Sequence, residues 1–194
     1  MIKSFWLILL TVVIVFACKR KEKDKPGNND YLPVNSFILS QVKHVDTSMY
    51  PIMKAEKMNS DSTWDTTFVK REDFRKLAED FLTVPDLTDI SIGKDYKEDK
   101  FLDNDLNRVV VTYTPLKDNL EIIKEEVVIA QGNAGSDRIH SIIIEKIKDG
   151  KDSTIHKRLL WQTDEKFQVV TLVEKNGQPV ATKTTEVTWN PSDQ

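Results

Sequence analysis

Residues 166–190 read KFQVVTLVEKNGQPVATKTTEVTWN. It is rich in β-branched and aromatic residues, a composition that is typical of strands. Alternate residues from Phe167 to Val173 would share one face of a strand. The dipeptide Asn176-Gly177 accepts the positive φ angles of a tight hairpin turn. The stretch therefore predicts two antiparallel strands, at 166–175 and 180–190.

Four further stretches ahead of this hairpin have the same composition. Turn residues separate them, among them Asp149-Gly150 and the glycine-containing segment at 132–135. Strands that follow one another through short connections form an antiparallel meander, which usually buries one of its faces. The six predicted strands cover residues 108–114, 120–130, 138–148, 153–162, 166–175 and 180–190.

Residues 71–82 predict an amphipathic helix that precedes these strands. Apolar residues recur at the i, i+3, i+4, i+7 and i+8 spacing from Phe74 to Leu82, and charged residues occupy the other face. Pro85 would end this helix. Residues 35–45 can form a second helix, although a strand also fits them.

These elements together predict an α+β fold, with an N-terminal helix or helices packed on a long antiparallel β-meander sheet. Such a sheet can curve into a half-barrel with a concave apolar face. The pattern leaves open whether the sheet closes fully into a barrel.

The first 18 residues carry a different pattern. Lys3 is followed by a run of 12 uncharged residues from Phe5 to Phe16, FWLILLTVVIVF. This run is too short to cross a hydrocarbon core comfortably as a helix, but it matches the apolar region of a signal peptide. It leads into Cys18, which is the only cysteine of the chain.

Residues 15–18 (VFAC) resemble the lipobox of bacterial lipoproteins, with aliphatic Val15, small Ala17 and then the obligatory cysteine. The resemblance implies that residues 1–17 are the signal peptide and that Cys18 is the lipidation site. Acyl chains on its sulfur and new amino group would hold the protein to membrane lipid. A solitary cysteine agrees with this interpretation, because exported proteins rarely keep a free thiol. The resemblance concerns processing only and implies no fold or activity.

Composition divides the mature chain into a tether and a domain. Residues 18–30 are the lipidated cysteine followed by KRKEKDKPGNND, which has no apolar side chain to bury and predicts a disordered tether. Residues 31–194 would form a single α+β globular domain, with 22 basic and 28 acidic side chains and a net charge of -6. An acidic body without a clustered basic face argues against nucleic acid as a partner.

Histidines and an acidic stretch are the candidates for metal ligation. A two-residue or four-residue turn at Asp149-Gly150 would place His140 and His156 on opposite faces of neighbouring strands. A three-residue loop would put them on one face, but about 13 Å apart. Residues 103–107 (DNDLN) resemble the start of an EF-hand loop, but Arg108 stands where that loop needs glycine. We therefore predict no metal site and no cofactor.

We also predict no catalytic residues. The sequence contains no Gly-x-Ser-x-Gly elbow and no glycine-rich phosphate loop. The adjacent carboxylates Glu125 and Glu126 would point to opposite faces of one strand. Trp161 and Trp189 fall near strand ends, where they could stack against a sugar or peptide ligand. Packing in the core is the alternative role for both indoles.

The sequence thus favours a membrane-anchored exported lipoprotein that acts as a non-catalytic binding or interaction module of the cell envelope. Its ligand would be a protein, a peptide or a glycan. A structural or assembly component of an envelope complex is one alternative, which would show a contiguous exposed apolar patch. An envelope hydrolase is the other, which would need a cleft with convergent titratable groups. Lys19 stands where aspartate would favour the inner membrane, so we expect the outer membrane and its periplasmic side.

Overall fold

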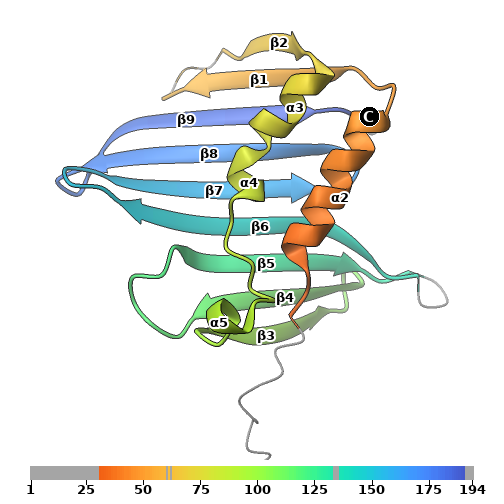
Figure 1. Cartoon of the computed structure of the whole chain (residues 1–194), viewed down its shortest axis with the longest axis vertical. Helices are drawn as coiled ribbons and strands as arrows, with labels where there is room; N and C mark the ends of the chain where they lie inside the picture. The colour runs from red at the N-terminus through yellow and green to blue at the C-terminus, as the bar shows by residue number, and fades with distance from the viewer. Residues whose placement is uncertain (1–30, 60, 62, 133–135, 191–194) are drawn as a thin grey trace, which may run out of the picture.

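The computed structural model describes residues 31–59, 61, 63–132 and 136–190. In this part of the chain, nine strands form one antiparallel sheet in the order β2-β1-β9-β8-β7-β6-β5-β4-β3 (Figure 1). The strands are β1 (Ile52–Met58), β2 (Asp65–Val69), β3 (Tyr96–Asp103), β4 (Arg108–Pro115), β5 (Ile122–Ala130), β6 (Arg138–Asp149), β7 (Thr154–Gln162), β8 (Lys166–Lys175) and β9 (Gln178–Thr188). The helices in the same residues are α2 (Val34–Thr47), α3 (Arg71–Leu77), α4 (Glu79–Leu82) and α5 (Ile90–Gly93).

The predicted antiparallel sheet is confirmed. The six predicted strands are β4 to β9, and every end lies within two residues of its expected place. The sheet is not closed, because its outermost strands β2 and β3 lie at opposite ends of the strand order. A fully closed barrel is therefore not the form that this sheet takes.

Three strands were not predicted, and all of them lie toward the two ends of the sheet. β3 has the charged sequence YKEDKFLD, and β1 and β2 read IMKAEKM and DTTFV. Strands near an edge expose much of their surface, so their apolar alternation is weak. β1 also pairs with β9, with Lys54 opposite Val187, so the first hairpin extends the sheet beyond its last strand.

The two predicted tight turns have different outcomes. Asn176 and Gly177 have φ angles of 51° and 72° and connect the paired residues Lys175 and Gln178, as expected for a two-residue hairpin. At the other turn Asp149 pairs with Thr154, so the connection is four residues long. The Thr154 hydroxyl donates to the Asp149 carboxylate at 2.9 Å, which closes this longer loop.

The ambiguous N-terminal segment is a helix. α2 buries Val34, Ile38, Val42 and Val45, whose spacing is that of one helical stripe. The predicted helix at 71–82 is present as two short helices, α3 and α4. They meet at Ala78, whose φ of -84° and ψ of 2° interrupt the helix. Figure 1 shows α2, α3 and α4 crossing one face of the sheet.

An aromatic cluster lies where these helices cross the sheet. Phe74 of α3 lies 5.2 Å from Trp189 and 5.8 Å from Phe167, measured between ring centroids. Phe81 of α4 lies 5.1 Å from Trp161 and 5.3 Å from Phe167. All five side chains are buried. The centre of the core is thus built from aromatic rings of both the helices and the sheet.

Candidate functional site

Strand register arranges the side chains of the helix-covered face in rows across the sheet, because directly paired residues share a face. One buried row contains Ile144, Leu159 and Val169, which are paired in turn across β6, β7 and β8. The next row outward contains Lys146 and Lys157, which are directly paired on β6 and β7. The face therefore changes from apolar to basic within one step along each strand.

A cleft of about 390 Å³ opens at this basic row, beside the end of α4. Helix cover and sheet both contribute to its walls. It is lined by Asp80, Thr83, Glu121, Lys146, Lys148, Ile155 and Lys157. Three ammonium groups and two carboxylates thus face one space, with an isoleucine among them.

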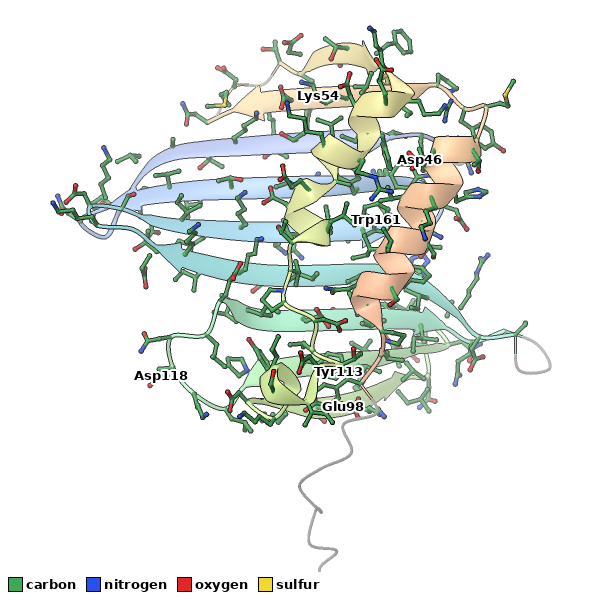
Figure 2. All side chains as sticks on the ribbon, viewed as in Figure 1. Asp46, Lys54, Glu98, Tyr113, Asp118 and Trp161 are labelled. Carbon is green, nitrogen blue, oxygen red and sulfur yellow. The ribbon has the colours of Figure 1, made fainter. Side chains whose placement is uncertain are left out.

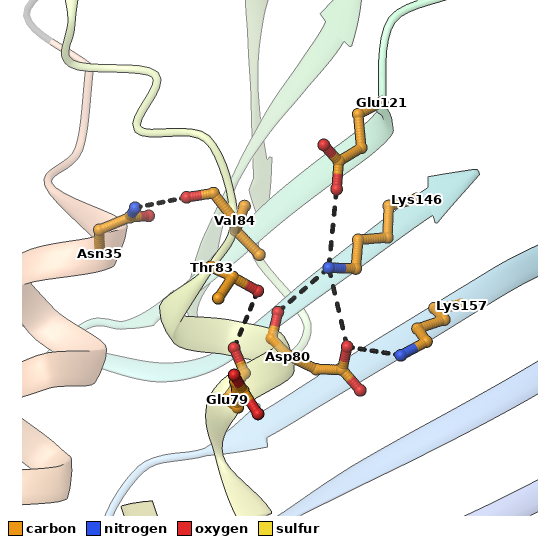
Figure 3. A network of polar contacts seen from close by, with 8 residues as sticks. All are labelled: Asn35, Glu79, Asp80, Thr83, Val84, Glu121, Lys146 and Lys157. Carbon is orange, nitrogen blue, oxygen red and sulfur yellow. Dashed lines mark hydrogen bonds and ion pairs between the residues drawn. The ribbon is translucent and has the colours of Figure 1, made fainter. Parts of the chain in front are cut away.

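Asp80 of α4 holds the paired lysines together (Figure 3). Lys157 Nζ lies 2.5 Å from Asp80 Oδ1, which is a strong charge-assisted hydrogen bond. Lys146 Nζ lies 3.9 Å from the same oxygen and 3.7 Å from Glu121 Oε1, and it donates to the Asp80 carbonyl oxygen at 3.3 Å. Like charges directly opposite each other destabilise a sheet, and Asp80 offsets this repulsion.

The lysines of the cleft differ in the ion pairs and hydrogen bonds that their ammonium groups make. The Lys146 side chain is only 11% exposed, yet its two ion pairs are longer than a hydrogen bond. Lys148 is exposed, and within the described residues it has no ion pair. An ammonium group has three donors, so donors remain for a further acceptor.

A second unusual feature is the carboxyl group of Glu125 on β5. The side chain is 1% exposed, and neither carboxyl oxygen has a hydrogen-bond partner among the described residues. Burial raises the pKa of this carboxyl group to about 8, and the negative charge of Asp86 adds to the shift. Glu125 is therefore mostly protonated and neutral at pH 7. The expected opposite orientation of Glu126 is confirmed, since it pairs with Thr112 while Glu125 pairs with Tyr113.

Three tyrosines, Tyr31, Tyr96 and Tyr113, make contacts at the segment that precedes α2. The Tyr113 hydroxyl accepts from the Leu32 amide at 3.0 Å and donates to Glu98 at 3.1 Å. Tyr31 donates to the Tyr96 carbonyl oxygen at 2.7 Å, and its ring centroid lies 4.7 Å from that of Tyr113. Figure 2 shows Tyr113 and Glu98 together at the β3–β4 end of the sheet. Neighbouring hydroxyl groups are thus committed to other partners and leave Glu125 unpaired.

Trp161 and Trp189 lie in the aromatic core, with exposed fractions of 0% and 1%. Figure 2 labels Trp161 at the place where the helices cross the sheet. Neither indole presents a face to solvent in this structure, so the arrangement matches the packing role and offers no ligand platform. Each indole Nε1 is buried and has no hydrogen-bond partner among the described residues. The burial agrees with the strand register, because Trp161 is two residues from buried Leu159 on β7 and therefore lies on the same, helix-covered face.

The histidines and the acidic stretch, which were the candidates for metal ligation, do not come together in one place. His156 pairs with Ile147, whereas His140 is in line with the buried Ile142 on the opposite face, as expected. Residues 103–107 form a hairpin turn in which the Asp103 carboxylate accepts from two backbone amides, each at 3.0 Å. Within the described residues, no cluster of three histidine or acidic side chains could hold a metal ion.

The predicted signal peptide, the predicted lipidation site Cys18 and the predicted tether lie outside the described residues. Among the residues that are described, no helix is long and apolar enough to cross a membrane. Comparison of the chain with protein-family models, with curated proteins and with solved structures found no match. The lysine cleft was missed by sequence analysis, because Lys146 and Lys157 meet only through strand register and Asp80 joins them from a helix.

Proposed function

We propose that this chain is an exported, membrane-anchored lipoprotein that acts as a non-catalytic binding module of the cell envelope, with the cleft beside α4 as its binding site. The observation that carries the proposal is the convergence of Lys146, Lys148 and Lys157 on one cleft of about 390 Å³. Small-ligand sites commonly have volumes of roughly 300–1,000 Å³ and a few well-placed polar groups. The charge of the cleft favours an acidic ligand.

Membrane anchoring rests on the lipobox-like stretch that ends at Cys18. Acyl chains on this cysteine would place the sheet at a membrane surface, on a tether of 12 residues (19–30). We propose the outer membrane and its periplasmic side, because Lys19 replaces the aspartate that favours inner-membrane retention. Metabolic labelling of Cys18 tests this part separately from binding.

We further propose that α2, α3 and α4 act as the stabilising cover of the sheet and as one wall of the cleft. Support comes from the buried stripe of α2 and from the ring contacts of Phe74 and Phe81 with the sheet. Asp80 lies one residue before Phe81, so the same short helix that buries a ring supplies the acidic group of the cleft.

A structural component of an envelope complex is the second candidate. The observation in its favour is an apolar pair on the edge hairpin, where Met53 and Phe68 are direct cross-strand neighbours that are 41% and 82% exposed. β2 is an outermost strand, so its free backbone groups could pair with a strand of another chain. Binding at this edge would not involve the cleft.

Site-specific photo-crosslinking in living cells separates the two candidates. A photoreactive amino acid replaces Thr83 in the cleft, Phe68 on the edge strand, or Glu72 on the exposed face of α3 as a control. Adducts at Thr83 and not at Glu72, identified by mass spectrometry, are expected for the binding module. Adducts confined to Phe68 would contradict it and favour the structural component.

A further inference from the structure

We propose that the cleft beside α4 binds a phosphate group through Lys146, Lys148 and Lys157, and that Asp80 competes with this phosphate for the same ammonium groups. The inference rests on the proposed function, because it names the ligand chemistry of the same cleft. Asp80 would therefore be a competitor of the ligand that belongs to the chain itself.

The positions of the three lysines follow from the strand register. Lys146 and Lys157 are directly paired, so their Cβ atoms lie about 4.5–5.5 Å apart. Lys148 follows two residues later on the same face of β6, diagonal to Lys157 at about 7–8 Å. Long lysine side chains at these separations can reach one shared anion. The sheet therefore places the backbone positions of three lysines in a triangle.

Asp80 satisfies this triangle only in part. Its carboxylate makes one short contact, to Lys157 at 2.5 Å, and one long contact, to Lys146 at 3.9 Å. Glu121 is 3.7 Å from Lys146, and neither acid pairs with Lys148. The lining carries three basic and two acidic groups, so a net charge of +1 remains for an anion.

Phosphate fits these donors better than a carboxylate does. Lysine acts as a point charge with rotatable donors, whereas a planar carboxylate is best matched by the fork of arginine. The residues that line the cleft include no arginine. A tetrahedral phosphate can accept from donors in three directions, which matches a triangle of lysines on a sheet.

An apolar row lies next to the lysines. Ile155, which lines the cleft, pairs with Lys148 on one side and with Val173 on the other. Val173 in turn pairs with Ala181, so the row crosses β7, β8 and β9. A phosphate that carries an apolar substituent could rest on this row. Free phosphate and a lipid headgroup thus share the same anchoring chemistry.

The test uses the full chain, purified in a non-ionic detergent and titrated with inorganic phosphate by calorimetry and by ³¹P NMR. Dihexanoyl phosphatidic acid, a short-chain lipid, forms the second arm, with dihexanoyl phosphatidylcholine as the zwitterionic control. We expect saturable binding in at least one of the first two arms. The arm that binds more tightly identifies the source of the phosphate.

Three variants connect the binding to the cleft. Lys148→Gln removes an exposed ammonium group without an ion pair and should weaken binding about tenfold, as expected for one charge–charge contact near a protein surface. Lys151→Gln removes an exposed lysine of the same hairpin that is outside the cleft lining, and it should bind like the wild type. Asp80→Asn should strengthen binding about tenfold, because the competing charge is removed.

Absence of saturable binding in both phosphate arms, for the wild type and for Asp80→Asn, would overturn the inference. Equal effects of Lys148→Gln and Lys151→Gln on binding would also overturn it. The phosphate would then be attracted by the overall charge of the hairpin and not by the cleft. Weaker binding by a folded Asp80→Asn chain, checked by circular dichroism, would overturn the competing role. Crosslinking at Thr83 does not depend on phosphate, so the proposed function is tested separately from this inference.

Discussion

The ring of Phe81 stands edge-on to the indole of Trp161, with centroids 5.1 Å apart and ring planes at 82°. One residue belongs to the four-residue helix α4 and the other to the middle of the sheet. Edge-to-face pairs of this kind contribute about 0.5–1.5 kcal/mol beyond the burial of their area. The contact links a short helix, which has little stability of its own, to the centre of the core.

Truncation of the buried rings should be severely destabilising. Phe81→Ala or Phe74→Ala should each lower the free energy of unfolding by about 3–5 kcal/mol, because both rings are fully buried and would leave cavities. Glu72→Ala and Glu79→Ala, at exposed positions of the same helices, should stay within about 0.5 kcal/mol. Urea denaturation measures all four. Phenylalanine variants that unfold like the wild type but lose a partner would make the apolar stripe a docking surface.

Replacement of Cys18 should abolish lipidation. Cys18→Ser removes the sulfur that would carry the acyl chains, so the protein should remain unprocessed or be released in a soluble form. Metabolic labelling with a fatty acid compares the variant with the wild type. Equal label in both proteins would rule out the lipoprotein interpretation.

A shortened chain that starts at Tyr31 should fold cooperatively, and its melting should not respond to reductant. Residues 31–194 contain no cysteine, and residues 19–30 have no apolar side chain to bury. A chain that starts at Val34 should be less stable, because it loses the bonds of Tyr31 to Tyr96 and of Leu32 to Tyr113. Thermal melting followed by circular dichroism compares the two. Equal melting temperatures would show that the tyrosine contacts contribute nothing.

Stability should depend on pH through Glu125. Its pKa is raised from an ordinary value of 4.5 to about 8 in the folded chain, so folding favours the protonated form. The stability that this group contributes is fully present below pH 4.5 and is lost as pH rises through about 8. Between these values, the loss should be about 1.4 kcal/mol per pH unit.

Glu125→Gln should remove this loss, because a neutral amide of similar shape does not titrate. The variant should match the wild type to within about 1 kcal/mol at pH 5 and exceed its stability at pH 8. Glu126→Gln, on the opposite face of β5, is the matched control and should keep the wild-type pH dependence. Parallel pH profiles for Glu125→Gln and the wild type would contradict the buried neutral carboxyl group.

Most of the local structure can be predicted from the amino-acid sequence. Period-two alternation predicted β8 over the observed range, and Asn176-Gly177 predicted a turn with two positive φ angles. Apolar spacing predicted a helix at 71–82, and alternation predicted that Glu125 and Glu126 diverge. These features depend on residues close together in the chain, whose steric and solvation preferences act within one element.

Contacts between elements that are distant in the sequence depend on tertiary packing. The pairing of β1 with β9 joins residues more than a hundred positions apart, and no local pattern encodes that choice. Trp161, a possible ligand platform in the sequence, is buried and packs in the core. Burial also raises the pKa of Glu125, so this carboxyl group is neutral at pH 7. The triangle of lysines around Asp80 has the same origin. Charge separations and burial depend on distances through space, and only the packed helices and sheet set those distances.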